Sequence, residues 1–147
     1  MIDKSLEVEA SLQLVNKKLH FEGLVEGNEA VSIDYIPPFG DNLGYTSLEL
    51  LLLSLSSCVG SAVLIFLRKM QKDIVSFQIQ SKGFRKQEHP TGFKQITMQL
   101  NITCDNLTVE EVAKVLQMTE STYCPVWSML KGNVEVLTSI NINPANA

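Results

Sequence analysis

The sequence predicts an α+β fold in which a mainly antiparallel sheet packs around one long, buried central helix. Several segments alternate apolar and polar residues with the period of a strand. One segment, which begins at Thr46, is apolar or small on every face for about twenty residues. The predicted strands and helices come in blocks rather than in single alternation, which is typical of this class. A chain of 147 residues is the size of one domain, so we expect a single domain over residues 1–147.

The chain opens with three predicted strands. Apolar residues fall on every second position over 6–14, and residues 19–25 and 30–36 are predicted to return as two further strands after turns. These strands would form an antiparallel meander. The following segment, 37–44, contains two prolines and two glycines, which end regular structure.

The long helix begins after this segment. Thr46 and Glu49 have the spacing of a capping box, and the helix can run to about Met70 or Lys72. Its length would allow it to cross a membrane. Glu49, four serines and the absence of another apolar span favour a core helix instead. One small domain has too few other residues to cover a helix that is apolar on every face. We therefore expect part of the helix to pack against a second copy in a homodimer.

The remaining elements follow in the same way. Strands are predicted over 75–83 and 93–103, joined by a polar loop. A second capping box, at Thr108 and Glu111, opens a helix that should run to about Ser121. A short helix should start at Cys124 and Pro125 and end at Gly132, and a last strand should cover 134–142.

Composition excludes several classes of function. The net charge is −4 and the only arginines are Arg68 and Arg85, which argues against a nucleic-acid partner. The first residues lack the basic and continuous apolar regions of a signal peptide, so we expect a cytoplasmic protein. No metal-ligand motif and no phosphate-binding glycine loop is present, so we expect no metal and no cofactor.

Three cysteines without CxxC spacing suggest free thiols in a reducing compartment. Cys58 lies on the long helix among small residues, which fits either core packing or room for a small ligand beside the sulfur. Cys124 should lie at a helix start, where free N–H groups favour an anion, so local chemistry makes it the better thiolate; it could also only cap the turn. Cys104 has no activating neighbours and is interpreted as a bystander.

With these residues in place, the chain resembles the OsmC/Ohr family of thiol-dependent hydroperoxide reductases. The resemblance covers nearly the whole chain from about Leu6 onward. The matching stretches are Gly44 to Cys58 on the long helix, Gln87 to Pro90 between two strands, Leu107 to Glu111 at a helix start, and Thr122 to Leu130 around the second cysteine.

The resemblance implies an intertwined homodimer with active sites at the interface. Cys58 would attack the hydroperoxide and become a sulfenic acid, and Cys124 would condense with it to a disulfide. A dithiol or a small thiol would then restore both cysteines. The implied role is reduction of hydroperoxides in oxidative-stress defence, with no membrane partner.

The chain departs from the family pattern at two positions. Family members place an arginine from the N-terminal strands beside the reactive thiol, and pair it with a glutamate about ten residues before that thiol. Here no arginine precedes Arg68, position 48 is leucine, and Glu49 stands nine residues before Cys58. Glu49 remains a candidate catalytic residue, although its capping box explains it. These departures leave a second hypothesis open: a non-catalytic dimer that binds a small hydrophobic ligand at its interface.

Overall fold

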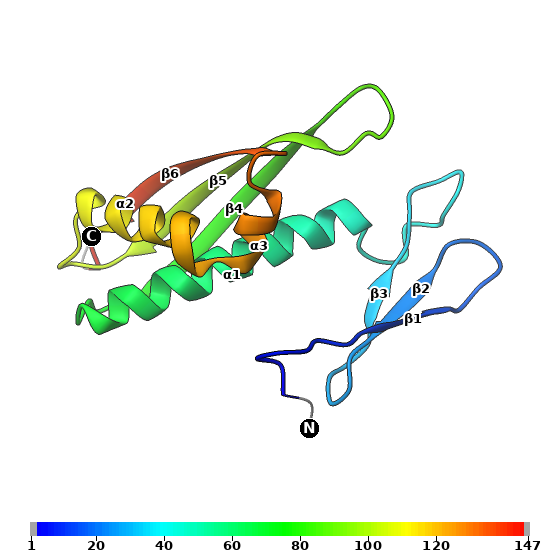
Figure 1. Ribbon diagram of the computed structural model, residues 1–147, viewed down its shortest axis with the longest axis horizontal. Helices are drawn as coiled ribbons and strands as arrows, with labels where there is room; N and C mark the ends of the chain where they lie inside the picture. Colours follow the sequence, from blue (N-terminus) through cyan, green and yellow to red (C-terminus); the bar gives the residue numbers. More distant parts are fainter. Residues whose placement is uncertain (1–2, 146–147) are drawn as a thin grey trace. The chain divides into compact units, whose positions relative to one another are not determined.

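The computed structural model describes residues 3–145 and has the predicted α+β architecture (Figure 1). The chain forms two compact units, residues 1–50 and 51–147, which are described in turn. The single-domain expectation stays a prediction. The elements in chain order are β1 (Ser11–Leu14), β2 (Phe21–Leu24), β3 (Val31–Ile33), α1 (Ser47–Lys69), β4 (Ser76–Arg85), β5 (Phe93–Thr103), α2 (Val109–Met118), the π-helical turn η1 (Thr119–Tyr123), α3 (Pro125–Leu130) and β6 (Glu135–Asn143).

The first unit contains the predicted antiparallel meander, with strand order β1-β2-β3. Its strands are shorter than the alternation predicts. Leu6 and Val8, with 93% and 73% of their surface exposed, lie before β1. Strand β1 pairs with β2 only from Ser11, opposite Leu24, where β2 ends. The alternation of apolar and polar residues over 6–14 therefore predicted a strand that is longer than the paired part of β1.

A buried carboxylate organises the loop after β3. Asp34 is 3% exposed and accepts hydrogen bonds from the backbone N–H groups of Tyr35, Asp41 and Leu43 at 2.7, 3.2 and 3.1 Å. Burial works to raise the pKa of Asp34, but the three N–H donors outweigh it and hold the pKa below its ordinary value. The proline- and glycine-rich loop is thus held by one side chain.

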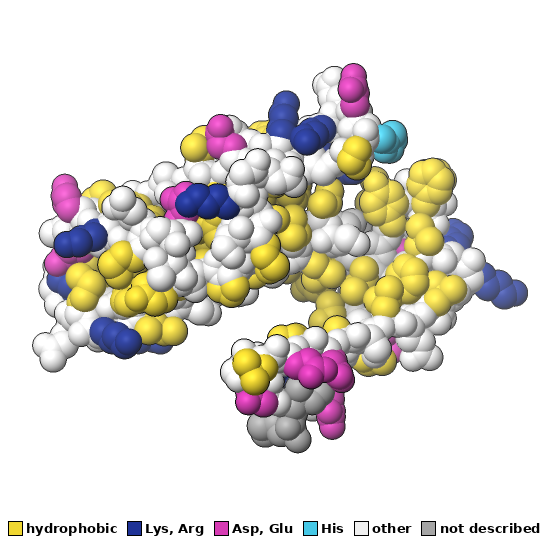
Figure 2. All heavy atoms as spheres, viewed as in Figure 1, with side chains coloured by type: hydrophobic (Ala, Val, Ile, Leu, Met, Phe, Trp, Pro, Cys, Tyr) yellow, Lys and Arg dark blue, Asp and Glu magenta, His cyan; other side chains and the backbone are white. Residues whose placement is uncertain are grey.

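Many apolar side chains of this unit are exposed, and Figure 2 shows hydrophobic side chains gathered at its surface. They lie on β1, in the loop after β3 and just before α1. They include Leu12, Leu14, Ile36, Phe39, Leu43 and Tyr45.

Helix α1 begins at the predicted capping box. The Thr46 N–H donates to Glu49 Oε1 at 2.8 Å, and the Glu49 N–H donates to Thr46 Oγ1 at 3.3 Å. The bond from the Thr46 backbone lowers the pKa of the Glu49 carboxyl, and the Thr46 hydroxyl adds to the effect. The sequence therefore predicted both the start of this helix and the reason for it.

The prediction that α1 is buried all round is wrong for the single chain. Leu53 and Ile65 are each 52% exposed, and with the exposed Ser57 and Ser61 they form a stripe at a spacing of four residues. The opposite side supplies the core residues Leu55, Val59, Gly60, Ala62, Val63 and Leu67. α1 is long and apolar enough to cross a membrane by length and composition, as core helices of soluble proteins also are. Its buried side supports the predicted core helix.

The second unit holds a separate sheet with the order β4-β5-β6. β4 and β5 are antiparallel, whereas β5 and β6 are parallel, from Gln95 opposite Glu135 to Thr103 opposite Asn143. A parallel pair needs a crossover connection, which α2, η1 and α3 supply (Figure 1). The sheets are therefore mainly antiparallel, as predicted, with one parallel pair.

The core of this unit lies between α1 and the sheet. Gly60 allows the close approach, because a Cβ at that position would meet the rings and methyl groups of Phe77 and Ile79 on β4 at 3.3 and 3.5 Å. β5 and the later helices add the other buried side chains. They include Phe93, Ile96, Met98, Leu100, Ile102, Val112, Leu116 and Trp127.

Candidate functional site

Cys58 lies halfway along α1 and borders an open groove of about 410 Å³. Its thiol is half-buried. Small side chains stand next to it on the helix, and they leave the space beside the sulfur that the sequence suggested. The groove is lined by Ser57, Cys58, Ser61, Ala62, Ile65, Phe66, Lys69 and Tyr123.

Two aromatic rings form one wall of the groove. The ring centroids of Phe66 and Tyr123 are 4.8 Å apart with an interplanar angle of 60°. Such tilted pairs are favourable beyond the area they bury. The ammonium group of Lys69 lies 5.8 Å from the centre of the Phe66 ring, within cation–π distance. The groove thus changes from a thiol and small residues at one end to rings and a cation at the other.

Cys124 is positioned by the turn between α2 and α3. The residues after α2 continue as a π-helical turn, and the Cys124 N–H closes it by donating to the Thr119 carbonyl at 3.0 Å. Such turns are frequent at functional sites. The Cys124 side chain then caps α3, with its Sγ accepting from the Trp127 N–H at 3.4 Å. Pro125 fills the first helical position, as predicted. This confirms the capping interpretation of Cys124.

The expectation that Cys124 is the better thiolate is wrong. Burial raises the pKa of Cys124 to about 11, and its interaction with the Cys58 thiol adds to the rise. The backbone N–H groups of Trp127 and Val126 act in the opposite direction but are outweighed. Helix α3 has only six residues, and Cys124 is 2% exposed, so desolvation of the anion exceeds the benefit of the helix start.

The structure brings Cys58 and Cys124 together. The Cys58 thiol is close enough to the Cys124 thiol to contribute to its raised pKa, and both are free thiols. Cys104 lies apart at the end of β5, where its thiol donates to Asn106 Oδ1 at 3.1 Å, in keeping with a bystander. Glu49 lies in the first unit, where its carboxylate completes the capping box. Its catalytic role stays a prediction.

Sequence reasoning did not assign Tyr123 and Lys69 to the site. Tyr123 is 54% exposed and faces Phe66. Helical spacing could have found the α1 residues, because Phe66 and Lys69 follow Cys58 by eight and eleven positions on one side of the helix. No comparable local signal exists for Tyr123, whose position depends on the π-helical turn.

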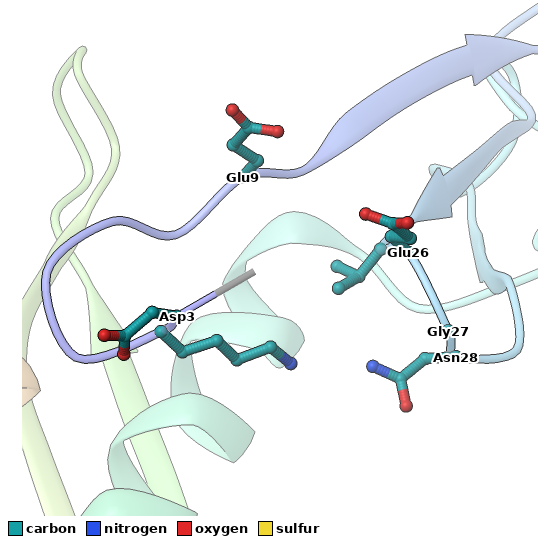
Figure 3. Close-up of a pocket in the computed structure, with 7 residues that line it drawn as sticks. Asp3, Glu9, Glu26, Gly27 and Asn28 are labelled. Carbon is teal, nitrogen blue, oxygen red and sulfur yellow. The ribbon is translucent and has the colours of Figure 1, made fainter. Parts of the chain in front are cut away.

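A second hollow, of about 830 Å³, lies in the first unit. Figure 3 shows that the carboxylates of Asp3, Glu9 and Glu26 in its lining do not converge on one point. It contains none of the predicted site residues. Within residues 3–145 no group of three or more His, Cys, Asp or Glu side chains could hold a metal ion. The groove beside Cys58 is therefore the candidate site.

Comparisons with known proteins give a consistent result. The family model described as OsmC-like protein matches residues 40–139. Protein YhfA of Escherichia coli strain K12 is 25% identical over 95 residues, which cover 65% of this chain and 71% of that protein.

Solved structures show the same fold. A hypothetical protein from Aquifex aeolicus VF5 is similar with a TM-score of 0.81 and 22% identity, covering 94% of this chain and 97% of that chain. An organic hydroperoxide resistance protein from Elizabethkingia anophelis is similar with a TM-score of 0.70 and 18% identity, covering 93% of this chain and 96% of that chain.

Proposed function

Because the chain belongs to the OsmC-like protein family, we propose that it is a thiol-dependent peroxidase that reduces organic hydroperoxides in oxidative-stress defence. The observation that supports this most is the juxtaposition of Cys58, which borders an open groove, with the buried Cys124. The similar protein from Elizabethkingia anophelis, named for organic hydroperoxide resistance, supports the choice of substrate. The comparisons do not favour the alternative of a non-catalytic binding protein.

In the first step the Cys58 thiolate attacks one oxygen of the hydroperoxide. The O–O bond breaks, the sulfur is oxidised to a sulfenic acid, and the alkoxide takes up a proton to leave as an alcohol. The groove exposes the Cys58 sulfur to such a substrate, and its apolar wall suits an organic group.

In the second step Cys124 resolves the sulfenic acid. Its sulfur forms a bond to the Cys58 sulfur, the S–O bond breaks, and the hydroxyl leaves as water with the proton of the Cys124 thiol. A dithiol then reduces the disulfide to two thiols and becomes a disulfide itself. Because Cys124 is buried and protonated, it is protected from direct oxidation until Cys58 has reacted.

The proposed working form is a cytoplasmic homodimer. Leu53, which is exposed on α1 and does not line the groove, offers an apolar contact that a second copy could cover. The exposed apolar residues of the first unit, such as Leu12 and Phe39, offer another. A reducing compartment would keep the three cysteines free, as they are here.

The test compares three cysteine variants with cumene hydroperoxide as substrate and a dithiol as reductant. Cys58→Ser should lose turnover to the uncatalysed level. Cys124→Ser should still form a Cys58 sulfenic acid, trapped with a cyclic dione and detected by mass spectrometry, but no intramolecular disulfide. Cys104→Ser is the matched control and should keep the parent rate. A Cys58→Ser variant that consumes the peroxide as fast as the parent would overturn the proposal.

A further inference from the structure

We propose that Thr119 is the residue that positions Cys124 for its reaction with Cys58. The inference rests on the proposed function, in which the Cys124 sulfur displaces the hydroxyl group of the Cys58 sulfenic acid. It assigns to that step a residue that lies outside the lining of the groove. Thr119 is a positioning residue in this account, because it acts through the backbone of the π-helical turn η1.

The side chain of Thr119 carries a buried hydroxyl at the junction of α2 and η1. The residue is 0% exposed, and its Oγ1 donates to the Val115 carbonyl one turn earlier at 2.8 Å. The Thr119 N–H is shared between the carbonyls of Val115 and Leu116. A threonine hydroxyl that bonds the carbonyl four residues before it often bends a helix. The regular part of α2 accordingly ends at Met118, directly before this residue.

The main chain of Thr119 holds Cys124. Its carbonyl accepts the Cys124 N–H at 3.0 Å, a bond that reaches five residues along the chain as in a π-helix. If α2 continued as an α-helix, the same carbonyl would accept the Tyr123 N–H, and Cys124 would be rotated by about 100° around the axis. Thr119 therefore holds the last turn of α2 with its side chain and the start of Cys124 with its carbonyl.

The register of this turn matters because its far end lies against α1. Tyr123 lines the groove together with Cys58, and its ring packs on Phe66 with the centroids 4.8 Å apart. Cys124 follows directly, and the nearby Cys58 thiol adds to the rise of its pKa. A change from the π-helical to the α-helical register would turn the Cys124 sulfur away from Cys58. The hydroxyl bond of Thr119 favours the register in which the two thiols meet.

Other side-chain contacts of the turn are exposed to solvent. The Ser121 hydroxyl donates to the Met118 carbonyl at 3.4 Å, and Glu120 lies 3.6 Å from Lys131 with both side chains more than 40% exposed. Exposed contacts of this kind contribute little. The buried bond of Thr119 is therefore the one expected to set the register, and Ser121 provides a matched control on the same turn.

The experiment measures how readily Cys58 and Cys124 form a disulfide in the full chain, with Cys104→Ser as the background. The protein is equilibrated with oxidised and reduced dithiothreitol. The two thiols lose two electrons and two protons and form an S–S bond, while the disulfide of the reagent is reduced to its dithiol. Alkylation and mass spectrometry give the equilibrium constant. Thr119→Val, which removes the hydroxyl, should lower this constant about three- to tenfold, and Ser121→Ala should leave it unchanged.

A second pair of variants separates positioning from stability. Thr119→Ser keeps the hydroxyl but loses a buried methyl group, so it should be less stable to urea and retain nearly the parent equilibrium constant. Thr119→Ala differs from it by the hydroxyl alone and should show the loss expected for Thr119→Val. Each pair tests the role by itself. Equilibrium constants that follow urea stability rather than the hydroxyl, or that are equal within each pair, overturn the inference.

A kinetic measurement connects Thr119 with the proposed reaction. With one equivalent of cumene hydroperoxide, Thr119→Val should form the Cys58 sulfenic acid at the parent rate. The disulfide should then form about three- to tenfold more slowly. Equal slowing of both steps contradicts a positioning role. A parent protein that does not reduce the peroxide refutes the proposed function alone, because the dithiothreitol equilibrium tests Thr119 without any peroxide.

Discussion

The thiols of Cys58 and Cys124 interact with each other, yet they lie in opposite environments: one borders an open groove and the other is 2% exposed. The contact depends on α1 on one side and on the turn between α2 and α3 on the other. In the proposed reaction, such a pair would separate attack from resolution by access, because only one sulfur can meet a substrate first. That asymmetry is measurable.

Alkylation should therefore be selective. Iodoacetamide added to the reduced, folded protein at about pH 8 should modify Cys58 and leave Cys124 and Cys104 largely unmodified, since the latter two are each 2% exposed. Peptide mass spectrometry gives the extent at each site. Protein unfolded in guanidinium chloride is the control and should react at all three. Faster modification of Cys124 than of Cys58 in the folded protein would contradict the proposal that Cys58 is the accessible thiol.

The raised pKa of Cys124 makes stability depend on alkaline pH. Burial raises this pKa from 9.0 to about 11, so the unfolded chain loses the proton first as the pH rises. The stabilising effect is complete below pH 9.0 and is lost as the pH rises through about 11. Urea unfolding of the parent should show a steeper loss of stability across this range than unfolding of Cys124→Ser. Parallel curves for the two proteins would mean that the thiol is not protected by the fold.

Sequence alone predicted what local chemistry determines. The capping boxes at Thr46 and Thr108 marked the starts of α1 and α2, because both partners lie within four residues. Strand β5 has the predicted bounds, Phe93–Thr103, because its alternation coincides with a full-length partner on β4.

The remaining features depend on contacts that are distant in the chain. The parallel pairing of β6 could not be predicted from alternation, which does not encode direction. The exposed stripe of α1 depends on which side of the helix packs on the sheet, and the residue types of α1 do not show that side. For Cys124, the helix start was predicted correctly, but local sequence does not show the burial that outweighs the effect of the helix start on the pKa. Sequence reasoning could therefore name the cysteines of the candidate site but not their environment.

Replacing the buried Asp34 should weaken the first unit. Asp34→Asn removes the charge that accepts three backbone N–H bonds, so thermal unfolding should occur at a lower Tm at neutral pH. The pKa of Asp34 is lowered in the folded state, so its stabilising effect is present above the unfolded pKa and is lost as the pH falls through the folded value. The Tm difference between parent and variant should therefore shrink in acid.

Asp41→Asn is the control for this substitution. Its carboxylate is 41% exposed and pairs with Lys18 at 2.6 Å, an arrangement that contributes little to stability in water. Circular dichroism melts at neutral and acidic pH compare the two variants. Equal Tm changes in Asp34→Asn and Asp41→Asn would show that the buried network is no stronger than a surface pair.

Two substitutions at Glu49 can separate capping from catalysis. Glutamine can still accept the Thr46 N–H bond, so Glu49→Gln should keep nearly the parent stability. Glu49→Ala removes the acceptor and should lower the free energy of unfolding by up to about 1 kcal/mol; the loss is small because the cap is exposed to solvent. If the carboxylate only caps α1, both variants should reduce cumene hydroperoxide at the parent rate. Urea unfolding and initial rates provide the two readouts. A large loss of kcat in Glu49→Gln with unchanged stability would instead assign the negative charge of Glu49 to the reaction.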